Sequence, residues 1–214
     1  MGTALLGFVA ASILIVMLPG PDTLVVVRNL LRGGRSRATT TAVGVLCGLA
    51  VWVAAACLGL SALLKASHTA YDVLRYVGGA YLLFIGIQAL RSRLGAHDEA
   101  PNVEGSVVVR SRYGPLLGSG FVAGMATDLL NPKVGVFFVT FLPAFVPAHE
   151  SVGAVTLLLG AIFIVETLLY FALLIRAGDR VVGWMRNPRT RQRMDRGAGL
   201  VFIGFGLRLA TESA

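Results

Sequence analysis

Four ionisable residues lie inside long apolar runs of this sequence: Asp22, Asp128, Lys133 and Glu166. Placing such a group at the centre of a bilayer costs at least about 2.5–3.5 kcal/mol, so each one is a candidate functional residue. Carboxylates and an ammonium group together can bind a ligand that carries both signs of charge. They can also pair with one another and only hold helices together, and the sequence leaves both interpretations open.

Prolines interrupt the first of these apolar runs, in the stretch "LPGPD" at 18–22, where Pro19, Gly20 and Pro21 precede Asp22. A proline removes one helical hydrogen bond and clashes with the preceding turn. In lipid, the freed carbonyl groups must find partners in the protein or in a wet cavity. We expect one half-helix to end near Leu18 and the next to carry Asp22 in its first turn, where an acidic side chain complements the helix dipole.

A second interruption is the stretch "LLNPK", in which Asn131 is a natural N-cap and Pro132 suits the first helical position. Lys133 then lies at a helix N-terminus, the unfavourable end for a cation. Its expected partner is Asp22, Asp128, the C-terminus of a half-helix or an anionic ligand group. In straight half-helices Asp22 would lie about 9 Å past the centre of its span, too far from Lys133 for an ion pair. The two share one site only if both breaks bend toward the membrane midplane.

The composition places these residues in a membrane protein. The 214 residues are 56% hydrophobic and 14% charged, whereas soluble domains average about 25% charged residues. Each apolar run is long enough to cross a hydrocarbon layer of about 30 Å as a helix. We therefore predict an all-α membrane protein, one domain over 1–214, with six transmembrane helices at roughly 4–27, 39–64, 73–91, 114–142, 152–175 and 195–211.

An internal repeat organises these spans. "GAYLLFIG" at 79–86 resembles "GAGLVFIG" at 197–204, and Pro21 and Pro132 occupy matching places in the two halves. Residues 1–95 and 113–214 are predicted to be two copies of a three-helix unit, joined by a linker at 96–112. Because three is odd, the second copy enters the membrane from the opposite side. Inverted repeats with corresponding interrupted helices are typical of secondary transporters.

The placement of the positive charges, which give the chain a formal net charge of +8, predicts its membrane topology. Arginines concentrate in the segments 28–37, 91–112 and 176–196, which follow the first, third and fifth spans, whereas the alternate loops hold only Lys65 and Arg75. Positive residues favour the cytoplasmic side, so these three segments are predicted to be cytoplasmic loops. The charge therefore gives no reason to expect a nucleic-acid partner.

Several stretches together resemble the LysE/RhtB family of bacterial amino-acid exporters over nearly the whole chain. They are "LPGPD", the basic turn "RGGRSRA" leading to Gly44 and Gly48, "GGAYLLFIGIQALRS", "LLNPKVGVFFVTFLPAFV" and "GAGLVFIGFGLRLA". The resemblance implies an inner-membrane exporter of a neutral or hydroxylated amino acid, such as threonine, homoserine or leucine, coupled to protons. It implies no cofactor or metal and no enzymatic activity, and it leaves a homodimer open. "RATTTAVG" at 37–44 and Asp128 depart from the family's usual residues, which bears on the substrate.

An amino-acid zwitterion suits the charged residues of the two breaks. Asp22, with Asp128 as a second acid, would bind the ammonium group together with freed carbonyls near Leu18 and Pro19. Lys133 and the amides that follow Asn131 would bind the carboxylate. A charged carboxylate is costly in a low-dielectric site, so Asp22, Asp128 or Glu166 is expected to carry the coupling proton.

The sequence lacks the residues that two other classes of function would need. A membrane carrier of metal ions or of reducing equivalents needs cysteines paired across the two copies, or clustered histidines and acids. Cys47 and Cys57 both lie in the second span, and the three histidines are far apart in sequence. An intramembrane enzyme would need a catalytic set such as HExxH, which does not occur.

Overall fold

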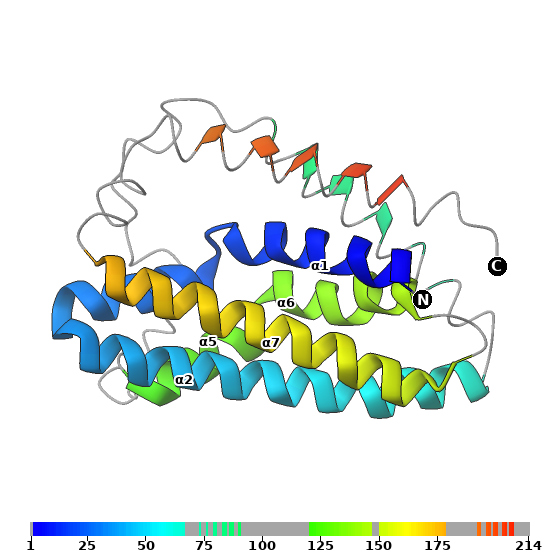
Figure 1. Cartoon of the computed structure of the whole chain (residues 1–214), viewed down its shortest axis with the longest axis horizontal. Coiled ribbons are helices and arrows are strands. Elements are labelled where there is room, and N and C mark those ends of the chain that lie inside the picture. Colours follow the sequence, from blue (N-terminus) through cyan, green and yellow to red (C-terminus); the bar gives the residue numbers. More distant parts are fainter. Residues whose placement is uncertain are drawn as a thin grey trace.

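The computed structural model describes residues 2–66, 120–146 and 150–178, together with single positions within 73–90 and 192–207. Every element in these described residues is helical. The elements, labelled as in Figure 1, are α1 (Gly2–Met17), α2 (Pro21–Ala66), α5 (Gly120–Leu129), α6 (Pro132–Val136), the π-helix η1 (Phe137–Phe141), the 3₁₀-helix η2 (Leu142–Phe145) and α7 (Val152–Ala177).

The first predicted break is confirmed. Helix α1 ends at Met17, and α2 begins at Pro21 with Asp22 in its first turn. Helical hydrogen bonding starts directly after the break, where the Leu24 amide donates to the Gly20 carbonyl oxygen at 3.0 Å. The last carbonyl groups of a helix lack their usual amide partners; here the Leu18 amide donates to the Ile15 carbonyl oxygen at 3.3 Å, and donors from elsewhere in the fold can satisfy the acceptors that remain.

The predicted cytoplasmic loop at 28–37 is wrong as a loop. Helix α2 continues through this segment and bends sharply at Gly34, whose φ of 69° and ψ of −171° are not helical. Glycine adopts such a positive φ without the steric cost that a Cβ would bring. The bend divides α2 into a short arm, 21–33, and a long arm, 35–66, and the side chains of Arg32, Arg35 and Arg37 around it are exposed.

The second predicted break is also confirmed. The Asn131 side chain caps α6 by accepting from the Lys133 amide at 3.0 Å, and Pro132 occupies the first turn. Helix α5 and the helical segment Pro132–Phe145 are bent by 49° relative to each other. The chain then passes from α-helix through the π-helix η1 into the 3₁₀-helix η2.

By length and apolar composition, the described residues contain two helices able to cross a membrane, α2 and α7. A third is present if α5 and the segment Pro132–Phe145 form one bent span. The predicted spans 73–91 and 195–211 lie largely outside the described residues, and the linker 96–112 lies wholly outside them. Six spans in an inverted repeat therefore stay a prediction.

Helix α7 lies between α1 and the long arm of α2 and contacts both (Figure 1). Where α7 crosses the long arm, Gly160 faces the Val53 side chain, and a Cβ there would lie 2.5 Å from it. An aromatic cluster fills the space beside this crossing, with the Phe137 and Phe163 rings stacked at 4.1 Å between centroids. Its other members are Phe8, Phe138, Phe141 and Phe145.

Glycines bring the long arm of α2 and α5 into direct backbone contact. A Cβ on Gly44 would overlap the Phe121 carbonyl oxygen, and a Cβ on Gly124 would overlap the Thr41 carbonyl oxygen. Small residues at these positions let two membrane helices approach closely. The stacking of α5 on α2 in turn fixes the position of the second break, at the C-terminal end of α5.

We predict that Gly44→Val strongly destabilises the protein, because the Phe121 carbonyl is part of a helix backbone and cannot move alone. Overpacking of this kind costs about 1–3 kcal/mol or more. Gly59→Val is the matched control, since no atom of the described residues lies within 4 Å of a Cβ at Gly59. Thermal unfolding of both variants in detergent measures the difference, and equal midpoints would contradict the helix contact.

Candidate functional site

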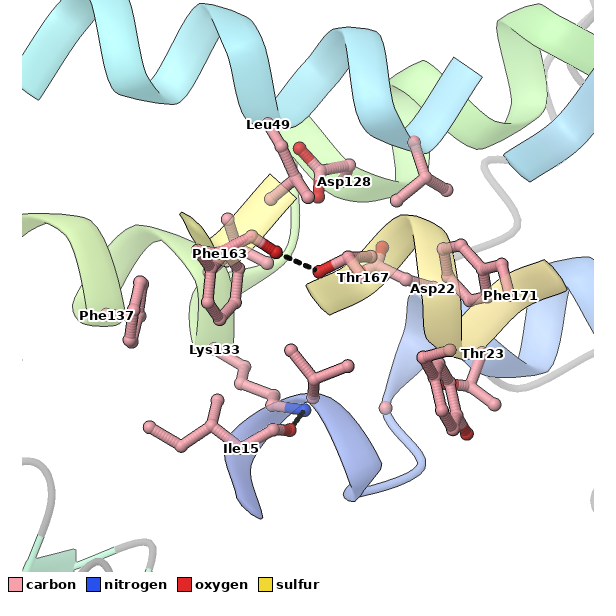
Figure 2. Close-up of a pocket in the computed structure, with 15 residues that line it drawn as sticks. Ile15, Asp22, Thr23, Leu49, Asp128, Lys133, Phe137, Phe163, Thr167 and Phe171 are labelled. Atoms are coloured by element: carbon pink, nitrogen blue, oxygen red, sulfur yellow. Dashed lines mark hydrogen bonds between the residues drawn. The ribbon is translucent and has the colours of Figure 1, made fainter. Parts of the chain in front are cut away.

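Lys133 joins the second break to the first. Its Nζ atom donates to the carbonyl oxygens of Ile15, at 2.7 Å, and Leu18, at 2.9 Å. These carbonyl groups belong to the C-terminal end of α1, where a cation is favoured by the helix dipole. Of the partners that the sequence left open for Lys133, the structure therefore selects the end of a half-helix (Figure 2).

Asn131 makes a second bridge between the breaks. Its side-chain Nδ2 donates to Asp22 Oδ2, while its Oδ1 accepts from the Lys133 amide. One amide side chain thus caps α6 and holds the acid in the first turn of α2. Asp22 also lies within electrostatic range of the Lys133 ammonium group. The two breaks therefore bend toward each other and form one site.

Asp128 is fully buried at the end of α5, with 0% of its surface exposed. Neither carboxyl oxygen has a hydrogen-bond partner among the described residues. Its side chain packs against Gly48 of α2, where a Cβ would lie 2.9 Å from the Asp128 Cβ. Gly48 therefore makes the space that this carboxyl group occupies.

A cavity opens between these groups. Asp22, Asp128 and Lys133, from α2, α5 and α6, are the ionisable residues of its lining, and Figure 2 shows Asp128 beside Leu49 and Lys133 directed toward Ile15. The remaining lining is apolar, aromatic or hydroxyl-bearing: Ile15, Val16, Gly20, Thr23, Val45, Leu49, Val134, Phe137, Phe163, Thr167, Tyr170 and Phe171. Such a wall can hold a small molecule with a charged end and an apolar end.

The cavity is tight in this conformation, with a volume of about 30 Å³ for the centres of water-sized molecules. Each ordered water needs about 10–15 Å³ by this measure, so two or three waters fit. A larger solute requires the surrounding half-helices to move apart. The breaks provide the places where such movement can occur.

The structure places some of the predicted site residues at the cavity and others elsewhere. Gly20, Asp22, Asp128 and Lys133 line the cavity, and Asn131 lies in the bridge behind them. The prolines at 19, 21 and 132 form the breaks and do not line the cavity.

Glu166 lies elsewhere on α7, close to Ser12 of α1 and outside the cavity lining. Its two carboxyl oxygens are buried without a hydrogen-bond partner among the described residues.

Sequence reasoning missed Trp52, which contacts both halves of the second broken helix. Its Nε1 donates to the Asp128 carbonyl oxygen at 3.4 Å, and its ring stacks on Phe138 with 6.4 Å between centroids. A Cβ on Gly135 would lie 3.2 Å from the same ring. Trp52 therefore packs across the break. A tryptophan in an apolar run is unremarkable in sequence, so no local signal marked it.

Apolar helices broken in pairs, with opposite charges meeting between them, define a multi-pass membrane protein that is helical throughout its described residues and has a polar cavity. This is the arrangement by which transporters bind small solutes within the bilayer. The chain belongs to the LysE type translocator family, whose sequence pattern matches residues 13–213.

The chain is similar over nearly its full length to proteins of several bacteria. It is 33% identical over 211 residues to the uncharacterized membrane protein PA4757 of Pseudomonas aeruginosa, covering 96% of this chain and 94% of the relative. It is 27% identical over 207 residues to the uncharacterized membrane protein YrhP of Bacillus subtilis, covering 96% and 97%. The leucine efflux protein of Klebsiella pneumoniae is 27% identical over 212 residues, with 96% and 94% covered. No solved structure matches the chain.

We predict that Asn131→Asp destabilises the protein although it keeps an excellent N-cap. The new carboxylate preserves the acceptor for the Lys133 amide but replaces the Nδ2 donor, so that two carboxylates face each other across the bridge. Loss of a buried hydrogen bond to a charged group costs about 1.5–3 kcal/mol. Thermal unfolding in detergent should show a lower midpoint, and an unchanged midpoint would contradict the bridge.

Proposed function

We propose that this chain exports neutral amino acids, with apolar or hydroxylated side chains such as leucine, threonine or homoserine, from the bacterial cytoplasm in exchange for protons. Membership of a translocator family and similarity to leucine efflux proteins support amino-acid export. The same comparisons favour it over transport of metal ions or of reducing equivalents. The inner membrane is the expected location, with the basic segments 28–37, 91–112 and 176–196 facing the cytoplasm.

One observation carries the proposal: Asp22 and Lys133 reach a single cavity from two different breaks. An α-amino acid presents an ammonium group and a carboxylate on one carbon, so its binding site needs both signs of charge within a few ångströms. Asp22 would accept hydrogen bonds from the ammonium group, with Asp128 as a second acid nearby. The Lys133 ammonium group, which has a third N–H donor beyond its two carbonyl bonds, would bind the carboxylate.

The apolar, aromatic and hydroxyl-bearing part of the lining fits the side chain of the substrate. Phe137 and Phe163 provide aromatic surface beside Leu49, whereas the hydroxyl groups of Thr23 and Tyr170 lie at the same cavity. A leucine-sized group would pack on the first set, and a hydroxyl group would find partners in the second. Among the described residues of the cavity lining the acids are Asp22 and Asp128; both are assigned to the α-ammonium group, which leaves no described acid for a basic side chain, and the proposal is therefore for neutral amino acids.

Transport requires the cavity to open alternately to each side. In the conformation described here the volume is too small for leucine, so the structure represents a closed arrangement. Opening would separate Lys133 from the end of α1, or Asn131 from Asp22, because these contacts join the two breaks. The substrate would replace some of the lost hydrogen bonds and lower the free-energy cost of the movement.

The direct test is efflux of labelled leucine, threonine and homoserine from preloaded cells that express the protein, with and without an uncoupler. Expression should raise the efflux rate of at least one amino acid at least fivefold, and the uncoupler should remove the increase. Absence of efflux for every amino acid tested, from cells with correctly inserted protein, would contradict the proposal.

We further predict that Asp22→Asn and Lys133→Ala lower efflux at least tenfold while the protein still inserts. Asparagine at position 22 keeps an acceptor for the Asn131 amide but loses the charge for the substrate ammonium group. Arg32→Ala, at the exposed bend of α2, is the control for loss of a positive charge. Wild-type efflux in both site variants, at equal protein levels by immunoblot, would remove the site assignment.

A further inference from the structure

Among the described residues, Asp128 is the acid of the cavity whose two carboxyl oxygens both lack a hydrogen-bond partner. It has no exposed surface and neither of its carboxyl oxygens accepts a hydrogen bond from the described residues. Asp22, in contrast, accepts from the Asn131 amide. Burying a carboxylate without a partner is strongly unfavourable, and a carboxyl group in such a place normally binds a proton. We therefore expect the Asp128 carboxyl group to be protonated, and so neutral, in this closed arrangement.

The charged and titratable groups around Asp128 support a neutral carboxyl group. On α2, Asp22 lies within electrostatic range and carries the same sign of charge. On α6, Lys133 directs its ammonium group to the Ile15 and Leu18 carbonyls at the end of α1. On α7, Tyr170 reaches Thr23, and Glu166 lies on the side toward Ser12. No cation in the described part of the cavity is directed at Asp128.

The space around Asp128 is shaped for its side chain. Gly48 leaves open the volume that the Asp128 carboxyl group fills, and Trp52 holds the main-chain carbonyl of the same residue. In Figure 2 Asp128 lies beside Leu49 at the cavity. The carboxyl group is thus fixed at the wall where a bound amino acid would lie.

We propose that Asp128 is the proton-exchange residue, which holds a proton in the closed state and gives it up when a substrate ammonium group binds beside it. This inference rests on the proposed function and selects one of the three acids that the sequence offered. Open to the cytoplasm, Asp128 releases its proton, and the carboxylate attracts the substrate ammonium group. Open to the outside, Asp128 takes a proton and the substrate leaves. One proton enters for each zwitterion exported.

Transport by purified protein in liposomes separates proton coupling from substrate binding. Exchange of labelled for unlabelled leucine at equal pH requires binding and alternating access but no net proton movement. Accumulation of leucine driven by an imposed pH gradient requires the proton. We expect Asp128→Asn to retain leucine exchange at a lower rate, because the substrate ammonium group loses one of its two carboxylates, and to lose at least tenfold more in pH-driven accumulation than in exchange.

Glu166→Gln is the matched control, because it removes the charge of another intramembrane acid that lies outside the cavity. It should retain both activities. Wild-type accumulation by Asp128→Asn, or selective loss of accumulation by Glu166→Gln, would overturn the inference. Equal losses of exchange and accumulation in Asp128→Asn would also overturn it, because Asp128 would then act in binding or folding alone.

Proton release on substrate binding gives a second test, on the wild-type protein. Leucine added to weakly buffered protein in detergent should release about one proton for each amino acid bound, measured with a pH indicator dye. Asp128→Asn should release none while binding leucine more weakly, and Glu166→Gln should match wild type. Binding without proton release by wild type would overturn the role of Asp128. Wild-type protein that neither binds nor exchanges any amino acid would instead refute the proposed function.

Discussion

The site depends on one requirement: the carbonyl groups exposed at the broken end of α1 must find hydrogen-bond donors inside a membrane. In water such groups are solvated, but in hydrocarbon each unsatisfied group costs several kcal/mol. Lys133 meets this requirement with two hydrogen bonds. The same contacts place the cation of the second break against the helix terminus of the first. The need to satisfy the backbone therefore creates the charged cavity.

The second bridge, made by Asn131, also arises because a helix end needs hydrogen-bond partners. Asn131 must cap α6, and its remaining amide donors are free to reach Asp22 at the start of α2. Close packing makes this reach feasible, because Gly44 and Gly124 bring α5 against α2. A cavity built from helix ends can also open, since each contact across it joins segments that end at a break.

The sequence was sufficient to predict the local features and insufficient for the contacts between distant segments. Proline chemistry predicted where α1 ends and where α6 begins, and Asn131 was identified as a cap. The partner of Lys133 stayed open, because Ile15 and Leu18 are more than a hundred residues away and hydropathy says nothing of how two breaks bend. The helical continuation through Gly34 was missed, since arginines and glycines indicate a loop as readily as a kinked helix. Glu166 was grouped with the site because hydropathy indicates how deep in the membrane a residue lies. It does not indicate which face of the helix the residue occupies.

The central claim is that the broken helices enclose a wet, substrate-binding cavity within the bilayer. Two neighbouring residues of α7 test it at nearly equal depth: Thr167, which lines the cavity, and Leu169, which faces outward. Each is replaced by cysteine in a variant without Cys47 and Cys57, and treated in membranes with a charged, water-soluble thiol reagent. The account predicts that Thr167→Cys reacts, that leucine slows this reaction, and that Leu169→Cys stays unmodified. Reaction at Leu169→Cys alone, or equal reaction at both positions without protection by any amino acid, would contradict it.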